Sequence, residues 1–115
     1  MARAKAVLPS ATDGTIRKLG DRNFMNVEEV DVEQLRRGAI VRVVTRDTTY
    51  FLEKSAEVCR VHIYKIPKNG SGDGGYQGKL NVQPRLRVGY NMIYGQSPSA
   101  AVASQGVLAI ALTRN

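Results

Sequence analysis

The chain has 115 residues, of which 43% are hydrophobic and 23% charged, so it is long enough for one packed domain and too apolar for general disorder. Seventeen Lys and Arg against ten Asp and Glu give a net charge of +7, which favours polyanions such as nucleic acid but is equally expected of a charge that only maintains solubility. The single cysteine excludes an internal disulfide, and no stretch has the apolar length of a signal peptide or a transmembrane segment, so we expect a cytoplasmic protein.

The charge is unevenly distributed along the chain. Residues 1–22 carry a net +3, residues 23–35 a net −4 and residues 36–115 a net +8. The first segment mixes Pro and Gly with scattered basic residues and shows no period, which predicts a basic N-terminal arm. Residues 23–115 are then expected to form a single β-domain, in which the acidic segment could cover basic side chains of its own chain or of a neighbour.

Residues 26–37 allow two interpretations. Asp31 is a good cap for a short helical turn that would end at Gly38, whereas the three β-branched valines of residues 27–32 favour a strand. Both alternatives remain open at the level of sequence.

From Gly38 onward the pattern is typical of β-structure. Residues 40–45 and 49–54 predict a hairpin closed at residues 46–48, and residues 57–66 alternate as a further strand that ends at Pro67. Cys59 lies in this strand between Val58 and Val61, which predicts a buried, unreactive thiol. Five glycines in residues 68–78 predict a mobile connection, the glycine loop.

Residues 79–90 show the cleanest alternation in the chain. The even positions from Leu80 to Tyr90 are apolar, while Lys79, Arg85 and Arg87 project from the opposite side. Pro84 interrupts the ladder and predicts an edge strand, a bulge or a break into two short strands. Residues 100–105 are expected to be a helical turn or a strand, and the apolar run 106–113 a buried strand.

These elements predict a mainly β fold: a small, partly closed β-barrel or compact sandwich of about five to seven short strands, with at most one or two short helical turns.

Residues 38–50, Gly-Ala-Ile-Val-Arg-Val-Val-Thr-Arg-Asp-Thr-Thr-Tyr, resemble the opening hairpin of small uncharacterised bacterial β-barrel proteins with the pattern Gly-x-x-Val-x-Val-x-Thr-[Arg/Lys]-[Asn/Asp]-[Ser/Thr]-x-Tyr. The resemblance implies a barrel and transfers no activity. In physical terms, Thr45, Asp47 and Thr48 are expected to bond locally and hold the turn, with Tyr50 packed over its base.

No catalytic or metal-binding pattern is evident. His62 is the only histidine and sits in mid-strand, which favours a structural role, and no set of Cys and His ligands can be assembled. The glycine loop lacks the Gly-Lys-Ser/Thr ending of a phosphate-binding P-loop. We therefore expect no enzyme activity, no cofactor and no metal.

The basic side of residues 79–87 is the most specific functional signal. Together with cations and an aromatic ring from neighbouring segments it predicts a nucleic-acid-binding β-face made of Lys79, Arg85, Arg87, Arg42, Arg60 and Tyr90. The first hypothesis is a non-enzymatic domain that binds RNA or DNA, either alone or within a larger particle. The alternative is a structural or assembly protein that forms a homo-oligomer through strand edges and the N-terminal arm.

Overall fold

The computed structural model describes residues 16–68 and 74–113, which form ten strands and three short helical turns. The helical elements are α2 (Ile16–Gly20), η2 (Val32–Gln34) and η3 (Pro98–Ala100). The strands are β1 (Phe24–Val27), β2 (Glu29–Asp31), β3 (Ile40–Val44), β4 (Thr48–Lys54), β5 (Arg60–Pro67), β6 (Gly75–Val82), β7 (Arg85–Arg87), β8 (Asn91–Gly95), β9 (Ala101–Gly106) and β10 (Ala109–Thr113).

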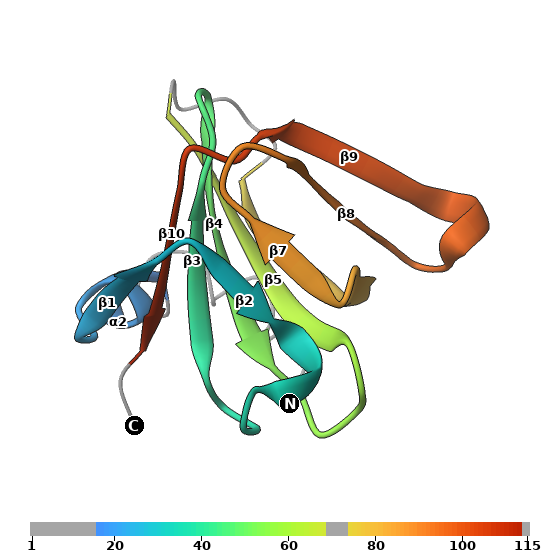
Figure 1. Ribbon diagram of the computed structural model, residues 1–115, viewed down its shortest axis with the longest axis horizontal. Coiled ribbons are helices and arrows are strands. Elements are labelled where there is room, and N and C mark those ends of the chain that lie inside the picture. The colour runs from blue at the N-terminus through green and yellow to red at the C-terminus, as the bar shows by residue number, and fades with distance from the viewer. Residues whose placement is uncertain (1–15, 69–73, 114–115) are drawn as a thin grey trace, which may run out of the picture.

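Eight of these strands form one sheet in the order β1-β10-β3-β4-β5-β6-β8-β9, and β2 and β7 form a second sheet of two strands. Every pair of neighbouring strands is antiparallel. Figure 1 shows the small sheet lying over the middle of the large one, with β8 and β9 projecting to one side. The mainly β prediction is confirmed, but the described residues form ten strands rather than five to seven, and they form no closed barrel.

The main core lies between the two sheets. Val30 of β2 and Leu86 of β7 belong to the same buried cluster as Val43, Leu52 and Ile63 of the large sheet. Every second side chain of β3, β4 and β5 points into this core. We call the side of the large sheet that faces this core its inner face. Burial of these aliphatic side chains is what holds the small sheet in place.

The other side of the large sheet, its outer face, is partly covered by α2. Leu19 of this helix joins Ile40, Phe51 and Tyr64 in a second buried cluster. The predicted N-terminal arm therefore ends in a short packed helix, while its residues 1–15 lie outside the described part. Residues 16–20 of the predicted arm are thus helical.

Residues 26–37 combine both interpretations that the sequence allowed. The segment contains the end of β1 and the whole of β2, and the 3-10 turn η2 follows directly. The Asp31 carboxylate accepts a hydrogen bond of 3.1 Å from the Glu33 amide, as expected of a cap. Gly38 then turns the chain with φ +90°, a conformation that favours glycine.

Of the three alternatives at Pro84, the structure has the break into two strands. β6 ends at Val82, and β7 begins at Arg85 in the other sheet. β6 itself starts at Gly75, earlier than the alternation from residue 79 indicated, because a bulge opposite Ile63 and Tyr64 accommodates Gly78 at φ +114°. Residues 69–73 of the glycine loop lie outside the described residues.

The C-terminal segment forms three strands. A 3-10 turn over residues 98–100 precedes β9, so the two readings of residues 100–105 were both partly right. β10 inserts between β1 and β3 and buries Ile110 and Ala111, but Leu108 just before it is 60% exposed. The apolar run 106–113 is therefore a buried strand only in its second half.

Candidate functional site

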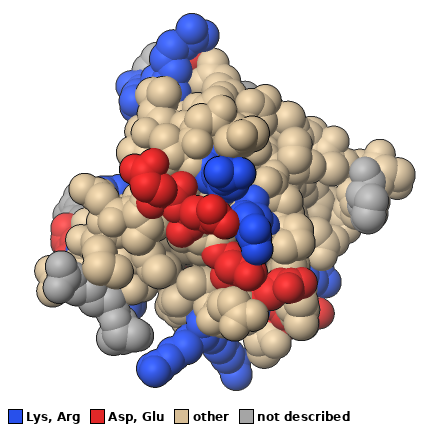
Figure 2. All heavy atoms as spheres, viewed as in Figure 1, with Lys and Arg blue, Asp and Glu red and all other residues tan. Residues whose placement is uncertain are grey.

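The two β7 cations face the acidic strand β2. Arg85 Nε lies 3.0 Å from Glu29 Oε2 and Arg87 Nε lies 3.5 Å from Glu29 Oε1, so one carboxylate serves both guanidinium groups. The register pairs Glu29 with Arg87 and Asp31 with Arg85, while Val30 and Leu86 between them point into the core. Figure 2 shows acidic and basic side chains interleaved in the middle of this face. The acidic segment therefore neutralises part of the predicted basic face of its own chain.

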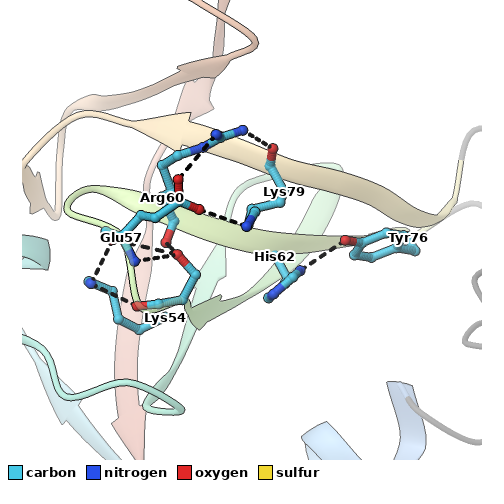
Figure 3. A network of polar contacts seen from close by, with 7 residues as sticks. Lys54, Glu57, Arg60, His62, Tyr76 and Lys79 are labelled. Carbon is cyan, nitrogen blue, oxygen red and sulfur yellow. Dashed lines mark hydrogen bonds and ion pairs between the residues drawn. The ribbon is translucent and has the colours of Figure 1, made fainter.

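Lys79 and Arg60 lie elsewhere, on the outer face of the large sheet, and share a second carboxylate (Figure 3). Lys79 Nζ is 2.6 Å from Glu57 Oε1, and Arg60 Nη1 is 3.6 Å from Glu57 Oε2. Arg60 Nη2 also donates to the Lys79 carbonyl at 2.8 Å. The hydrogen bond from Lys79, with Arg60 acting in the same direction, holds the pKa of the Glu57 carboxyl below its usual value.

The two remaining residues of the predicted set are Arg42 and Tyr90. Arg42 lies apart from the Glu29 and Glu57 ion pairs, and Tyr90 joins only the group around Arg87. Arg42 of β3 is two strands away from Arg60 and stacks on Phe24, with 4.8 Å from its guanidinium carbon to the ring centroid. Tyr90 is 58% exposed and lies under the Arg87 guanidinium at 5.1 Å. The six residues thus divide into Arg85, Arg87 and Tyr90 beside the small sheet, and Lys79, Arg60 and Arg42 on the outer face of the large sheet.

The turn residues behave partly as predicted. Thr45 Oγ1 donates to the Thr48 carbonyl at 2.9 Å and accepts from the Thr48 amide at 3.2 Å, which closes the β3–β4 turn. Asp47 instead bonds to Gln105, 58 positions away, and Tyr50 packs edge-on against Tyr94 on the inner face. Burial raises the pKa of the Tyr50 phenol, and its hydrogen bond to Tyr94 raises it further.

Cys59 differs from the prediction of a buried thiol. It is half-buried, has φ +55° and lies just before β5, with Sγ 3.8 Å from Glu33 Oε2. Its neighbour Val58 is 71% exposed, so the apolar flank that suggested burial faces solvent. Burial, followed by the nearby Glu33 carboxylate, raises the pKa of this thiol and leaves it mostly protonated.

His62 is half-buried on the outer face of β5, where its Nδ1 lies 2.9 Å from the Tyr76 hydroxyl (Figure 3). Within residues 16–68 and 74–113, no group of three His, Cys, Asp or Glu side chains could hold a metal ion. None of the helices described is long and apolar enough to cross a membrane.

The β8–β9 hairpin was not singled out in the sequence analysis, although it carries no charged side chain. Residues 88–113 contain no Asp, Glu, Lys or Arg in a chain of 23% charged residues. On the hairpin, Ile93 is 41% exposed and Val102 is 53% exposed. Figure 2 accordingly shows neither blue nor red where this hairpin projects. A count of charges along the chain would have revealed the stretch.

β9 also leaves one edge of the large sheet open. It pairs with β8 on one side, and no other strand in the described ranges pairs with its second side. Two hollows flank the hairpin: an apolar one of about 360 Å³ bordered by Pro84, Ile93 and Ala101, and a more polar one of about 520 Å³ between Tyr50, Lys65 and Val102. Exposed edges are normally protected by charge, proline or a covering segment. β9 has neither charge nor proline.

No family model, no curated protein and no solved structure matches this chain. The resemblance of residues 38–50 to bacterial β-barrel proteins therefore stays a prediction.

Proposed function

We propose that this chain is a structural or assembly protein that self-associates through the free edge of β9. The observation that carries the proposal is a strand edge that no described strand pairs with, on an uncharged hairpin that exposes Ile93 and Val102, in a chain of net charge +7. Backbone amides and carbonyls along such an edge are ready to pair with another strand. The exposed Val102 and Ile93 side chains would add apolar contact on association.

The test compares two lysine substitutions under multi-angle light scattering over a range of concentrations. Val102→Lys places a charge on the β9 edge, whereas Leu108→Lys places the same charge at a similarly exposed apolar position outside the strand. We expect the wild type and Leu108→Lys to associate, and Val102→Lys to weaken association at least about tenfold, because an unpaired charge in an interface costs more than about 1.4 kcal/mol. A wild-type monomer at every concentration, or equal effects of both lysines, would overturn the proposal.

A second candidate function is nucleic-acid binding, and one observation favours it. The Arg87 guanidinium lies over the exposed ring of Tyr90, with Arg85 two residues away, so cations and a stacking surface occur together. Such a combination can hold a phosphate backbone and a base. Glu29 reduces the charge of this group, which makes it the weaker of the two candidates.

Fluorescence anisotropy with short single-stranded RNA and DNA at several salt concentrations tests this candidate. Arg87→Gln should weaken binding more than Arg46→Gln, which removes an equal charge from the exposed β3–β4 turn. No binding at low salt, or equal losses for the two variants, would exclude a specific site at Arg87.

A further inference from the structure

The side chains of the β8–β9 hairpin form two rows that are interrupted at the free edge. On one side Tyr94 of β8 stands opposite Val102 of β9, and on the other Ile93 stands opposite Ala103. Tyr94 also packs on Tyr50, so its row belongs to the inner face of the sheet. Each row ends at β9 with a side chain that remains exposed, Val102 on one side and Ala103 on the other.

The charge distribution indicates which partner fits this edge. All the charged residues of the chain lie outside residues 88–113, and they sum to +7. Two copies therefore repel through their charged bodies, and they meet without that repulsion only along the uncharged stretch. Because the hairpin projects from the body (Figure 1), contact between two hairpins also keeps the bodies furthest apart, where salt screens them best. The hairpin itself offers a polyanion no charged side chain. The partner that fits is a second copy of the same chain.

Among the described strands, the other outer strand of the large sheet is β1, at the opposite end from β9. Pairing β9 with β1 would bring the hairpin of one copy against the charged body of the next. It would also repeat head to tail without closing on itself. Pairing of β9 with β9 covers the open β9 edge of each copy at once and gives a closed dimer.

We propose that two copies pair through β9 in antiparallel orientation, about a two-fold axis that runs midway between the two Val102 residues; this inference rests on the proposed function. A two-fold axis perpendicular to the sheet maps the inner face onto itself, so directly opposed residues must come from the same face. The axis must therefore run midway between two copies of the same residue. At Val102 it creates the row Tyr94, Val102, Val102 of the second copy and Tyr94 of the second copy, and it sets Ala101 opposite Ala103.

Positions nearer the body fit less well. Ser104 is 6% exposed, and its hydroxyl already accepts a hydrogen bond from the Met92 amide. Gln105 is held by Asp47 at the base of the hairpin. An axis at either residue would draw the two charged bodies together, whereas Val102 lies next to Ala101 at the start of β9 and near the tip of the hairpin.

Disulfide trapping tests the register. Cys59 is the only cysteine, so Cys59→Ser gives a background in which single cysteines can be placed at will. Opposed residues of antiparallel strands have Cα atoms about 4.5–5.5 Å apart, within the range that a disulfide bridges, whereas diagonal neighbours are about 7–8 Å apart. With oxidised glutathione as oxidant, Val102→Cys should convert largely to a covalent dimer. Ala103→Cys alone should stay largely unlinked, and a mixture of Ala101→Cys and Ala103→Cys should link.

Met25→Cys on β1, exposed at 42%, is the control for the alternative edge. Linking of Val102→Cys only in a mixture with Met25→Cys, or of Ala103→Cys alone, would overturn the two-fold register while leaving self-association intact. Light scattering of wild type and of the reduced variants separates that outcome from failure of the proposed function. A wild type that is monomeric in solution overturns both.

Discussion

Asp47 and Gln105 bind each other through two hydrogen bonds, one in each direction. The Asp47 amide donates to Gln105 Oε1 at 3.0 Å, and Gln105 Nε2 donates to Asp47 Oδ2 at 2.8 Å. This pair joins the β3–β4 turn to the last residues of β9, although β9 is far from both β3 and β4 in the order of the large sheet. It therefore fixes the base of the hairpin relative to the body.

Gln105→Ala should loosen the hairpin without unfolding the protein. Both partners are exposed, so the loss of the two bonds should lower the free energy of unfolding by about 1 kcal/mol. Hydrogen exchange at the amides of β9 should accelerate more than exchange in β4. Gln96→Ala is the matched control, because the Gln96 side chain has no hydrogen-bond partner within the described residues; an equal acceleration there would contradict the anchoring role.

Leu86→Ala should be strongly destabilising because this side chain, 1% exposed, connects the two sheets. We expect a loss of about 2–5 kcal/mol in the free energy of unfolding, measured by urea denaturation. Leu108→Ala changes the same residue type at a 60% exposed position and should cost less than about 0.5 kcal/mol. Similar losses in the two variants would mean that β7 contributes little to the core.

Glu29→Gln should release both β7 guanidinium groups. The ion pairs are exposed, so stability should change by less than about 1 kcal/mol. Affinity for short RNA, measured by anisotropy at low salt, should rise if Arg85 and Arg87 contact phosphates. Glu28→Gln makes the same change in net charge at an exposed neighbour without an ion pair in the described structure. If the two variants gain equally, affinity follows net charge rather than a site.

The strand pattern could be predicted from the sequence where each strand has one buried face. Val61 and Ile63 alternate with His62 and Tyr64 because neighbouring side chains must point to opposite faces, and this local rule holds in the structure. The break at Pro84 was one of three alternatives that the sequence allowed, because proline has no N–H to donate to a ladder.

The pairing of strands could not be predicted in this way. That β7 leaves the large sheet to pair with β2 depends on the core available to Leu86 and Val30, which alternation within β7 does not reveal. The predicted basic face does not form for the same reason. Lys79 and Arg87 are both at odd positions, as in a single alternating strand, but they belong to different sheets. Only the acidic segment around Glu29 was a correct hint of the ion pairs that form.

Self-association and nucleic-acid binding should respond to salt in opposite directions. Two copies of charge +7 repel each other, so added salt should strengthen an association that runs through uncharged β9. Binding to nucleic acid should weaken with salt, because it releases counterions. Sedimentation velocity of the protein alone at low and high salt checks the first expectation. Association that disappears at high salt would point to ion pairs in the interface and away from β9.

The stability of the wild type should fall at acid pH partly through Glu57. Lys79 and Arg60 lower the pKa of this carboxyl in the folded protein, whereas in the unfolded chain the pKa keeps its ordinary value. The folded state therefore binds the proton less tightly, and the stabilisation is complete above the unfolded pKa and lost as the pH falls through the lowered folded pKa. Glu57→Gln, compared with wild type by urea denaturation, should be less stable at neutral pH, and the two proteins should converge as the pH falls through the lowered folded pKa. Because the pair is exposed, high salt should reduce the difference. A gap between the two proteins that stays constant down to low pH would show that the Glu57 charge is not the cause.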